Sequence, residues 1–381
     1  MTEDWSVPET EVLAAVRDLL AGDREGVLAT VVDVEGSAYR RPGAKMVVTA
    51  DGEGTGAITA GCLEDEVQQL AREVLDAGEP RVETYDLMDD DGDDVWGLGV
   101  GCNGIIDVLL EPLSDADAYR PAVEANERGE DVAVLTVLDG PTDGRRAYYH
   151  PGRDAFEGVG VPEAAREALR EPAADLAGRG RADTVTVETP DGDVTVFVDG
   201  VAAPPELVVF GSGHDVGPVV DLAKRNDFRV TVCAFRGAVD LAARFPAADR
   251  RLSVAAPRVG EELDLDDDTY AVVASHNFVD DRLAVEALLD SPVPYVGLMG
   301  PHERFEEMLE EFREEGRAFG EDDLESLYTP VGLDLGGGSP HQIATSIVAE
   351  VLAVHNDRDP GHLRDRKGHI HERVELAPDG Q

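Results

Sequence analysis

The residues best suited to bind a ligand form a short basic segment at positions 36–46, GSAYRRPGAKM. No acidic residue occurs from position 36 to position 50, although the chain carries 80 acidic and 33 basic residues. Arginine and lysine supply charge-assisted hydrogen-bond donors, while glycine and proline supply turns with accessible amides. We therefore expect Arg40, Arg41 and Lys45 to bind phosphate or another anion. The alternative is a surface loop whose arginines pair with nearby carboxylates.

Two cysteines follow glycines in the same half of the chain. Cys62 precedes a predicted helix, and Cys102 leads into a predicted strand. The positive end of a helix dipole stabilises a thiolate, which makes cysteine there a better soft ligand or nucleophile. We expect both cysteines to belong to one site, as potential contacts of a metal, although each could equally be a small buried side chain. This site would also contain the neighbouring residues Gly61, Glu64, Gly101 and Gly104.

The third cysteine is expected to be structural, and the cysteine spacing does not favour a structural zinc site. Cys233 continues an apolar strand, so we expect it to fill the core. The chain has no closely spaced cysteine pairs, which structural zinc sites generally use.

A glycine turn between a strand and a helix opens the second half of the chain, with Gly211, Gly213 and His214 in the sequence LVVFGSGH. Such turns place a phosphate at a helix N-terminus in dinucleotide-binding folds. The third glycine comes one place later than in the usual NAD fingerprint. The next strand ends with Arg236 and has no acidic residue to hold an adenosine ribose. The turn therefore indicates the fold rather than bound NAD.

The elements that position these residues form two α/β domains. We predict an N-terminal mixed α+β domain over residues 1–200 and a Rossmann-like, doubly wound parallel sheet over residues 201–355, because strands and helices alternate after residue 205. His276 follows one of these strands, at the edge where ligands bind in open α/β sheets, although a structural role is equally compatible. Residues 356–381 are charged and aperiodic, and we expect a disordered tail.

Hydrophobic periodicity predicts the individual elements. Helices are expected over residues 7–20, 62–77, 214–226, 279–289, 302–314 and 340–354. Strands are expected over residues 26–34, 45–49, 56–59, 81–87, 105–111, 132–138, 184–188, 194–198, 207–210, 228–233, 270–275 and 295–299.

The charge of the chain excludes some partners and indicates an environment. The net charge is −47, and the acidic residues are dispersed while only three lysines occur. Such a surface is typical of adaptation to molar salt, where the Debye length is about 3 Å. It does not favour nucleic acid, which requires a basic surface. No apolar run approaches the roughly 20 residues of a membrane helix, and the N-terminus does not resemble a signal peptide. We expect a soluble, cytoplasmic protein with no membrane contact.

Taken in order, these motifs resemble the XdhC/CoxI family of accessory factors for xanthine dehydrogenase and related molybdenum hydroxylases. The resemblance covers roughly residues 10–355 and rests on residues 36–46, 61–64, 101–104, 211–214, 295–300, 331–334 and 343–350. The chain departs from the family pattern at Ala234-Phe235, where an acidic pair is usual, and after Gly300, where one arginine replaces a basic cluster.

The resemblance implies a factor that binds molybdenum cofactor, supports its sulfuration and delivers it to an apo-hydroxylase. Cationic donors suit the phosphate of molybdopterin, and thiols suit its molybdenum. We therefore predict a cofactor chaperone rather than an enzyme, with a molybdenum hydroxylase client, a cysteine desulfurase as a further partner and a homodimeric state. The alternatives are an NAD(P)-dependent oxidoreductase that uses the second domain and a plain interaction scaffold.

Overall fold

The computed structural model describes residues 6–22, 24–87, 103–113, 119–139, 145–236 and 239–365. The chain divides into two compact units, with the boundary between Ala203 and Pro204. Within the described ranges, no helix combines the length and the apolar character needed to span a membrane.

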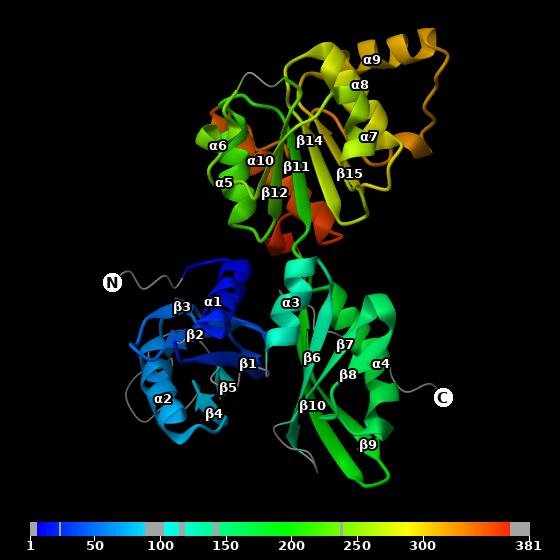
Figure 1. The fold of residues 1–381 in the computed structure, drawn as a ribbon. Coiled ribbons are helices and arrows are strands. Elements are labelled where there is room, and N and C mark those ends of the chain that lie inside the picture. The colour runs from blue at the N-terminus through cyan, green and yellow to red at the C-terminus, as the bar shows by residue number, and fades with distance from the viewer. Residues whose placement is uncertain are drawn as a thin grey trace. The chain divides into compact units, whose positions relative to one another are not determined.

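The first half of unit 1 is a five-stranded antiparallel sheet with two helices (Figure 1). Its strand order is β3-β2-β1-β5-β4. The elements are α1 (Glu9–Ala21), β1 (Gly26–Ser37), β2 (Lys45–Thr49), β3 (Gly54–Gly56), α2 (Glu64–Ala77), β4 (Arg81–Asp86) and β5 (Asn103–Pro112). Apolar residues spaced at helical intervals, such as Val67, Ala71 and Val74, pack α2 onto one face of this sheet.

The second half of unit 1 has its own antiparallel sheet, ordered β8-β7-β6-β10-β9. The elements are α3 (Arg120–Arg128), β6 (Val132–Asp139), β7 (Arg146–His150), a 3₁₀ turn (Pro151–Arg153), β8 (Ala155–Glu157), α4 (Glu163–Gly178), β9 (Ala182–Thr189) and β10 (Gly192–Val201). Helix α4 packs onto one face of the sheet through Ala165, Leu169 and Ala173. A core shared by α1, α3, β1, β2, β6 and β7 joins the two halves.

The two halves of unit 1 have the same topology. Each follows the order helix, three strands, helix, two strands, and each sheet has the spatial order 3-2-1-5-4 when its strands are numbered from its own start. The strand registers agree as well, because Thr30 lies opposite Lys45 in the first half and Thr136 lies opposite Arg146 in the second. Unit 1 is therefore an internal structural repeat, which we call repeat 1 (residues 9–112) and repeat 2 (residues 120–201).

Unit 2 is a six-stranded parallel sheet with the order β13-β12-β11-β14-β15-β16. Numbered along the chain, this is the 3-2-1-4-5-6 order of the Rossmann fold. The strands are β11 (Glu206–Phe210), β12 (Arg229–Ala234), β13 (Arg250–Ser253), β14 (Thr269–Val273), β15 (Tyr295–Leu298) and β16 (Leu327–Tyr328). The helices are α5 (Val216–Lys224), α6 (Leu241–Arg244), α7 (Val259–Glu262), α8 (Phe278–Leu289), α9 (His302–Glu314) and α10 (Pro340–His355), with 3₁₀ turns at Ala256–Arg258, Asp322–Leu324 and Leu363–Asp365.

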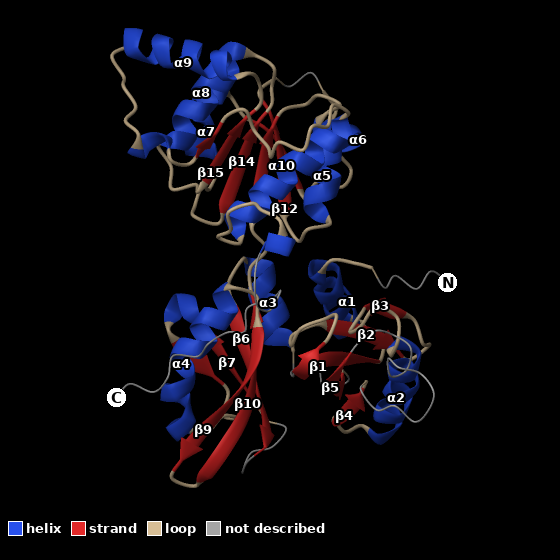
Figure 2. Cartoon of the chain, turned by 180° about the vertical axis from the view of Figure 1, so that it is seen from behind, coloured by secondary structure: helices blue, strands red, loops and turns tan. Residues whose placement is uncertain are grey.

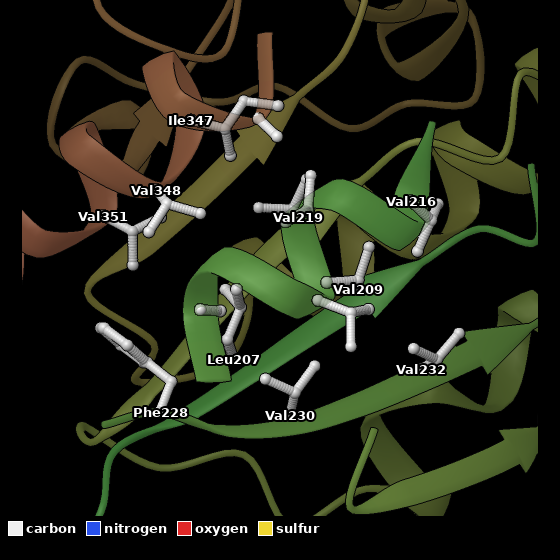
Figure 3. Close-up of a cluster of buried hydrophobic side chains, with 14 of the residues drawn as sticks. Leu207, Val209, Val216, Val219, Phe228, Val230, Val232, Ile347, Val348 and Val351 are labelled. Carbon is white, nitrogen blue, oxygen red and sulfur yellow. The ribbon is translucent and has the colours of Figure 1, made fainter. Parts of the chain in front are cut away.

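Helices cover both faces of the sheet in unit 2 (Figure 2). Helices α5 and α10 pack on one face, where Leu207 and Val209 of β11 belong to the same buried cluster as Val219 of α5 and Val348 of α10 (Figure 3). Helices α7, α8 and α9 pack on the other face, against Val208 and Phe210. Successive residues of β11 thus face opposite layers, as the pleat of a strand requires. The predicted fold class is confirmed: a mixed α+β region is followed by a doubly wound parallel sheet.

The predicted elements differ from the structure in repeat 2 and in unit 2. In repeat 2, helices α3 and α4 and strands β7 and β8 were not predicted, whereas strands β6, β9 and β10 were. In unit 2, the short helices α6 and α7 and the edge strands β13 and β16 were not predicted. The second strand of the first hairpin is Gly54–Gly56, which begins two residues and ends three residues earlier than expected. Helix α2 begins at Glu64 rather than at Cys62. Of the tail, residues 356–365 are exposed, and the remaining residues lie outside the described ranges.

Candidate functional site

The basic segment forms the connection between β1 and β2 and folds back onto β1. The amide of Gly43 donates to the carbonyl of Val31 at 2.8 Å, and the amide of Val31 donates to the carbonyl of Ala44 at 2.9 Å. Gly43 has a φ of +92°, a conformation that favours glycine. Gly43 therefore permits the turn that follows Arg40 and Arg41 and returns the chain to β1.

The side chains of this connection have different surroundings. Arg40 forms an ion pair with Glu9 at the start of α1. Arg41 is exposed, and its pKa is lowered by partial burial and by the positive charge of Arg181. Tyr39 is 65% exposed. Tyr39 and Arg41 are thus more exposed than Arg40, and the sequence analysis did not single out the tyrosine.

Lys45 is buried and lies close to a carboxylate of repeat 2. Its Nζ lies 2.7 Å from Oδ1 of Asp199 on β10 and 2.9 Å from the carbonyl oxygen of Gly43. Its side chain is 8% exposed and that of Asp199 is 4% exposed. The hydroxyl of Tyr119 donates to the other oxygen of Asp199 at 2.7 Å. The charge of Lys45 is therefore paired with a carboxylate inside the protein.

Cys62 lies in the turn between β3 and α2, partly buried against the core of repeat 1. Its amide donates to the hydroxyl of Thr59 at 3.2 Å. Gly61 before it is exposed and has a φ of +106°, and a Cβ at this position would meet no atom within 4 Å. The backbone conformation therefore calls for glycine here, and the space beside Gly61 is open.

Glu64 is buried and supports this turn. It is fully buried, and its carboxylate accepts hydrogen bonds from the amide of Thr59 at 2.9 Å, from the hydroxyl of Thr59 and from the amide of Leu63 at 3.1 Å. These donors occupy the carboxylate, and no surface of it is exposed. Glu64 positions the turn that carries Cys62.

The strand pairing brings the basic connection next to the segment that follows Cys102. Gly104 on β5 lies opposite Gly36 on β1, and its carbonyl accepts a hydrogen bond from the amide of Leu87 at 3.0 Å. The expected site residues Gly101 and Cys102 lie outside the described residues. The described part of the chain contains no group of three or more histidine, cysteine, aspartate or glutamate residues arranged to hold a metal ion.

In unit 2, the predicted glycine turn follows β11 at the carboxyl edge of the sheet. A Cβ on Gly211 would lie 2.6 Å from the carbonyl oxygen of Ala274, so this turn passes close to the end of β14. A Cβ on Gly213 would lie 2.2 Å from Oδ1 of Asp215. The strands β11 and β14 are neighbours at the point where the strand order reverses, which is where doubly wound folds bind ligands.

His276 meets the glycine turn at this edge. Its Nε2 lies 2.9 Å from Oδ2 of Asp215, and its φ of +59° is unusual for a residue other than glycine. His214 lies exposed in the same turn. The structure thus brings four of the expected residues to one edge of unit 2, namely Gly211, Gly213, His214 and His276.

A buried ion pair behind this edge was not anticipated. Asp281 is 1% exposed, its Oδ2 lies 2.6 Å from a guanidinium nitrogen of Arg304, and its other oxygen accepts from the amide of Ser275 at 3.2 Å. Burial raises the pKa of Asp281. An acidic residue in the first turn of a helix is common, so the sequence contained no signal for this role.

Cys233 and Arg236 complete the comparison with the expected residues of unit 2. Cys233 is fully buried, and burial raises the pKa of its thiol to about 12, so the prediction that it fills the core is confirmed. Arg236 follows β12, is exposed and pairs with Asp280 at 3.0 Å.

Comparison with known protein families identifies both units. Residues 19–86 match the family model described as the XdhC and CoxI family, and residues 207–351 match the model described as the XdhC Rossmann domain. The first match covers most of repeat 1, and the second covers β11 through most of α10.

Similar proteins match nearly the whole chain. A protein from Bacillus subtilis, described as a probable xanthine dehydrogenase subunit, is 30% identical over 88% of this chain and 94% of its own length. The molybdenum cofactor insertion chaperone PaoD from Escherichia coli is 22% identical over 94% of this chain and 95% of its own length. The crystal structure of a xanthine dehydrogenase from Bacillus halodurans has a TM-score of 0.72 and 27% identity, covering 91% of this chain and 96% of that chain. The chain belongs to the XdhC and CoxI family.

Proposed function

We propose that this protein is an accessory factor that binds molybdenum cofactor, supports its sulfuration and delivers it to an apo molybdenum hydroxylase of the xanthine or CO dehydrogenase type. The observation that carries the proposal is the pairing of Gly36 with Gly104, which sets the start of the basic connection beside the segment that follows Cys102. Support also comes from the likeness to a relative named as a molybdenum cofactor insertion chaperone.

The residues present fit the chemistry of this cofactor. Molybdopterin has an anionic phosphate, and Arg41 supplies an exposed guanidinium in an acid-free segment. A dithiolene-bound molybdenum suits soft ligands, and the partly buried thiol of Cys62 lies beside the open space at Gly61. When bound, the cofactor supplies the redox chemistry of the client, whereas this chain holds and shields it.

The roles of the other residues in repeat 1 follow from their contacts. Glu64 holds the turn of Cys62, and Lys45 anchors the end of the basic connection in the interior. Arg40 joins the same connection to α1 through Glu9. These residues therefore position the cofactor loops, while Arg41, Cys62 and Cys102 would contact the cofactor.

The test is metal and pterin analysis of the full chain purified from its own host, followed by transfer to an apo-hydroxylase. We expect bound molybdopterin and recovery of hydroxylase activity. The variants Cys62→Ala and Cys102→Ala should fold normally and deliver less active cofactor, whereas Cys233→Ala is the matched control and should deliver as the parent does. Parental delivery by both site variants would remove the cysteines from the proposed site.

A homodimer, a cysteine desulfurase partner and a cytoplasmic location belong to the same proposal. Mass measurement in molar KCl tests the dimer, and co-purification with a desulfurase tests the second partner.

The alternative of an NAD(P)-dependent oxidoreductase is less well supported. The Rossmann strand order and the close approach at Gly211 are compatible with a dinucleotide. However, β12 ends at Ala234 and is followed by Phe235, which stacks on Phe210 with ring centroids 5.6 Å apart. No acidic residue stands there for the ribose hydroxyls. Titration with NAD and NADP would decide between the two functions.

A further inference from the structure

A tyrosine hydroxyl in repeat 1 is buried without a hydrogen-bond partner. Tyr85, on β4, is 7% exposed, and its hydroxyl oxygen makes no hydrogen bond with any residue that the structure describes. The hydroxyls of Tyr119, Tyr149 and Tyr295 each donate to a carboxylate. A buried tyrosine hydroxyl normally has such a partner, because leaving a polar group unpaired away from water costs free energy. Tyr85 therefore departs from the pattern of these other tyrosines.

The strand register places Tyr85 close to the glycine pair of the candidate site. Tyr85 lies opposite Ile106 on β5, which lies opposite Val34 on β1, so these three side chains share one face of the sheet. The pair formed by Gly36 and Gly104 lies two residues away along each strand, a distance of about 7 Å. Tyr85 is thus in the neighbouring row, on the same face as this pair.

The same face also carries the turn of Cys62. Tyr85 belongs to the buried cluster beneath α2 that includes Leu63, and Cys62 packs against this cluster. Burial raises the pKa of Tyr85, and the charges of Glu66, in the first turn of α2, and of Glu83 contribute to the shift. Neither carboxylate accepts a hydrogen bond from the hydroxyl. The tyrosine therefore keeps its proton at neutral pH and is a donor whose acceptor is missing.

We propose that the hydroxyl of Tyr85 donates a hydrogen bond to the pterin ring of the bound cofactor. The inference rests on the proposed function and adds a residue that the sequence motifs do not contain. A pterin ring is flat and has carbonyl and ring-nitrogen acceptors, so it suits an apolar wall that carries a single donor. Cys62 contacts the molybdenum in the proposed function, so the two side chains recognise different parts of one ligand.

The test measures both ligand binding and stability in Tyr85→Phe, which removes only the hydroxyl oxygen. Anaerobic titrations of the full chain use molybdenum cofactor and metal-free molybdopterin. The affinity for both forms should fall roughly 3- to 10-fold, the usual effect of losing one hydrogen bond, because the two forms carry the same ring. The melting temperature of the free protein should not fall, since the hydroxyl has no partner there to lose.

Tyr149→Phe is the matched control in repeat 2. Tyr149 is 3% exposed, and its hydroxyl donates to Asp154 at 2.7 Å. This variant loses the same atom together with an internal hydrogen bond. Its melting temperature should therefore fall, while its affinity for both forms of the ligand should equal that of the parent.

Parental affinity of Tyr85→Phe for both forms would overturn the inference and leave the proposed function standing. A weaker affinity for the metal-containing form alone would also overturn it, because the loss would then concern the molybdenum rather than the ring. A melting temperature lowered as in Tyr149→Phe would show that the hydroxyl has an internal partner, which contradicts the inference as well. A parent chain that binds neither form would overturn the proposed function, and the inference with it.

Discussion

Lys45 and Asp199 form a buried ion pair that joins the two repeats of unit 1, with 2.7 Å between Nζ and Oδ1. A second, largely buried pair joins Arg146 of repeat 2 to Glu111 of repeat 1. Lys45 and Arg146 occupy equivalent positions in the two repeats, opposite Thr30 and Thr136. The two carboxylates are equivalent as well, because Glu111 lies opposite Leu28 on β1 and Asp199 lies opposite Val134 on β6. Each repeat thus supplies the cation of one ion pair and the carboxylate of the other.

Breaking the first pair should destabilise the protein strongly. In Lys45→Met, the carboxylate of Asp199 stays buried without its cation, and such a loss costs about 3–5 kcal/mol. The control is Lys224→Met, because Lys224 pairs with Asp249 at 2.9 Å with both side chains about a third exposed. That change should cost at most about 1 kcal/mol. Urea unfolding in molar KCl measures the free energy of unfolding of both variants. Equal losses would show that the buried pair contributes no more to stability than the exposed one.

Glu64→Gln should destabilise the turn of Cys62. An amide has only one acceptor oxygen, so at least one of the donors from Thr59 and Leu63 loses its partner, which costs about 1–3 kcal/mol. Glu66→Gln, an exposed change in the same helical turn, should stay within about 0.5 kcal/mol. The rate at which iodoacetamide alkylates Cys62 should change in the first variant only. An unaltered rate together with unaltered stability would contradict the supporting role of Glu64.

Cys233 should make the protein less stable at alkaline pH. Burial raises the pKa of its thiol to about 12 in the folded protein, whereas an unfolded thiol ionises near pH 8.5. The folded state therefore keeps its proton, and this contribution is complete below about pH 8.5 and is lost as the pH rises towards 12. The slope is up to about 1.4 kcal/mol per pH unit. Urea unfolding between about pH 8.5 and 10 should show a shallower decline in Cys233→Ala. Parallel declines would contradict this prediction.

The acidic surface should make folding depend on salt. With a net charge of −47, lowering the ionic strength increases the repulsion between carboxylates in the compact state. Thermal unfolding should move to lower temperature as KCl falls from molar to about 0.1 M, where the Debye length is about 10 Å. A melting temperature independent of KCl would require another explanation of the composition.

Elements with strong periodicity and clear ends could be predicted from the sequence. Helix α9 runs from His302 to Glu314 as expected, because Phe305, Met308 and Phe312 are spaced for one buried face and Pro301 precedes the first turn. Helix α4 was missed because its buried face consists largely of alanine and Pro172 lies within it. Without α4, the second repeat could not be recognised.

The candidate site was predictable in its location and less so in the roles of its residues. The acid-free segment identified the connection between β1 and β2, but the partner of Lys45 lies 154 residues away, a distance that no local pattern spans. Glu64 resembled an ordinary charge in a first helical turn, and only the fold shows that its carboxylate is buried.

The internal repeat has a consequence for the stoichiometry of binding. The final strands of repeat 1 are separated by 16 residues, whereas those of repeat 2 are joined across Pro190 and Asp191 alone. A dimer of identical modules would offer two equal sites, but this chain has elaborated only one of its two halves. We expect one cofactor molecule per chain, bound mainly by repeat 1. Repeat 2 would then serve to support the binding site of repeat 1.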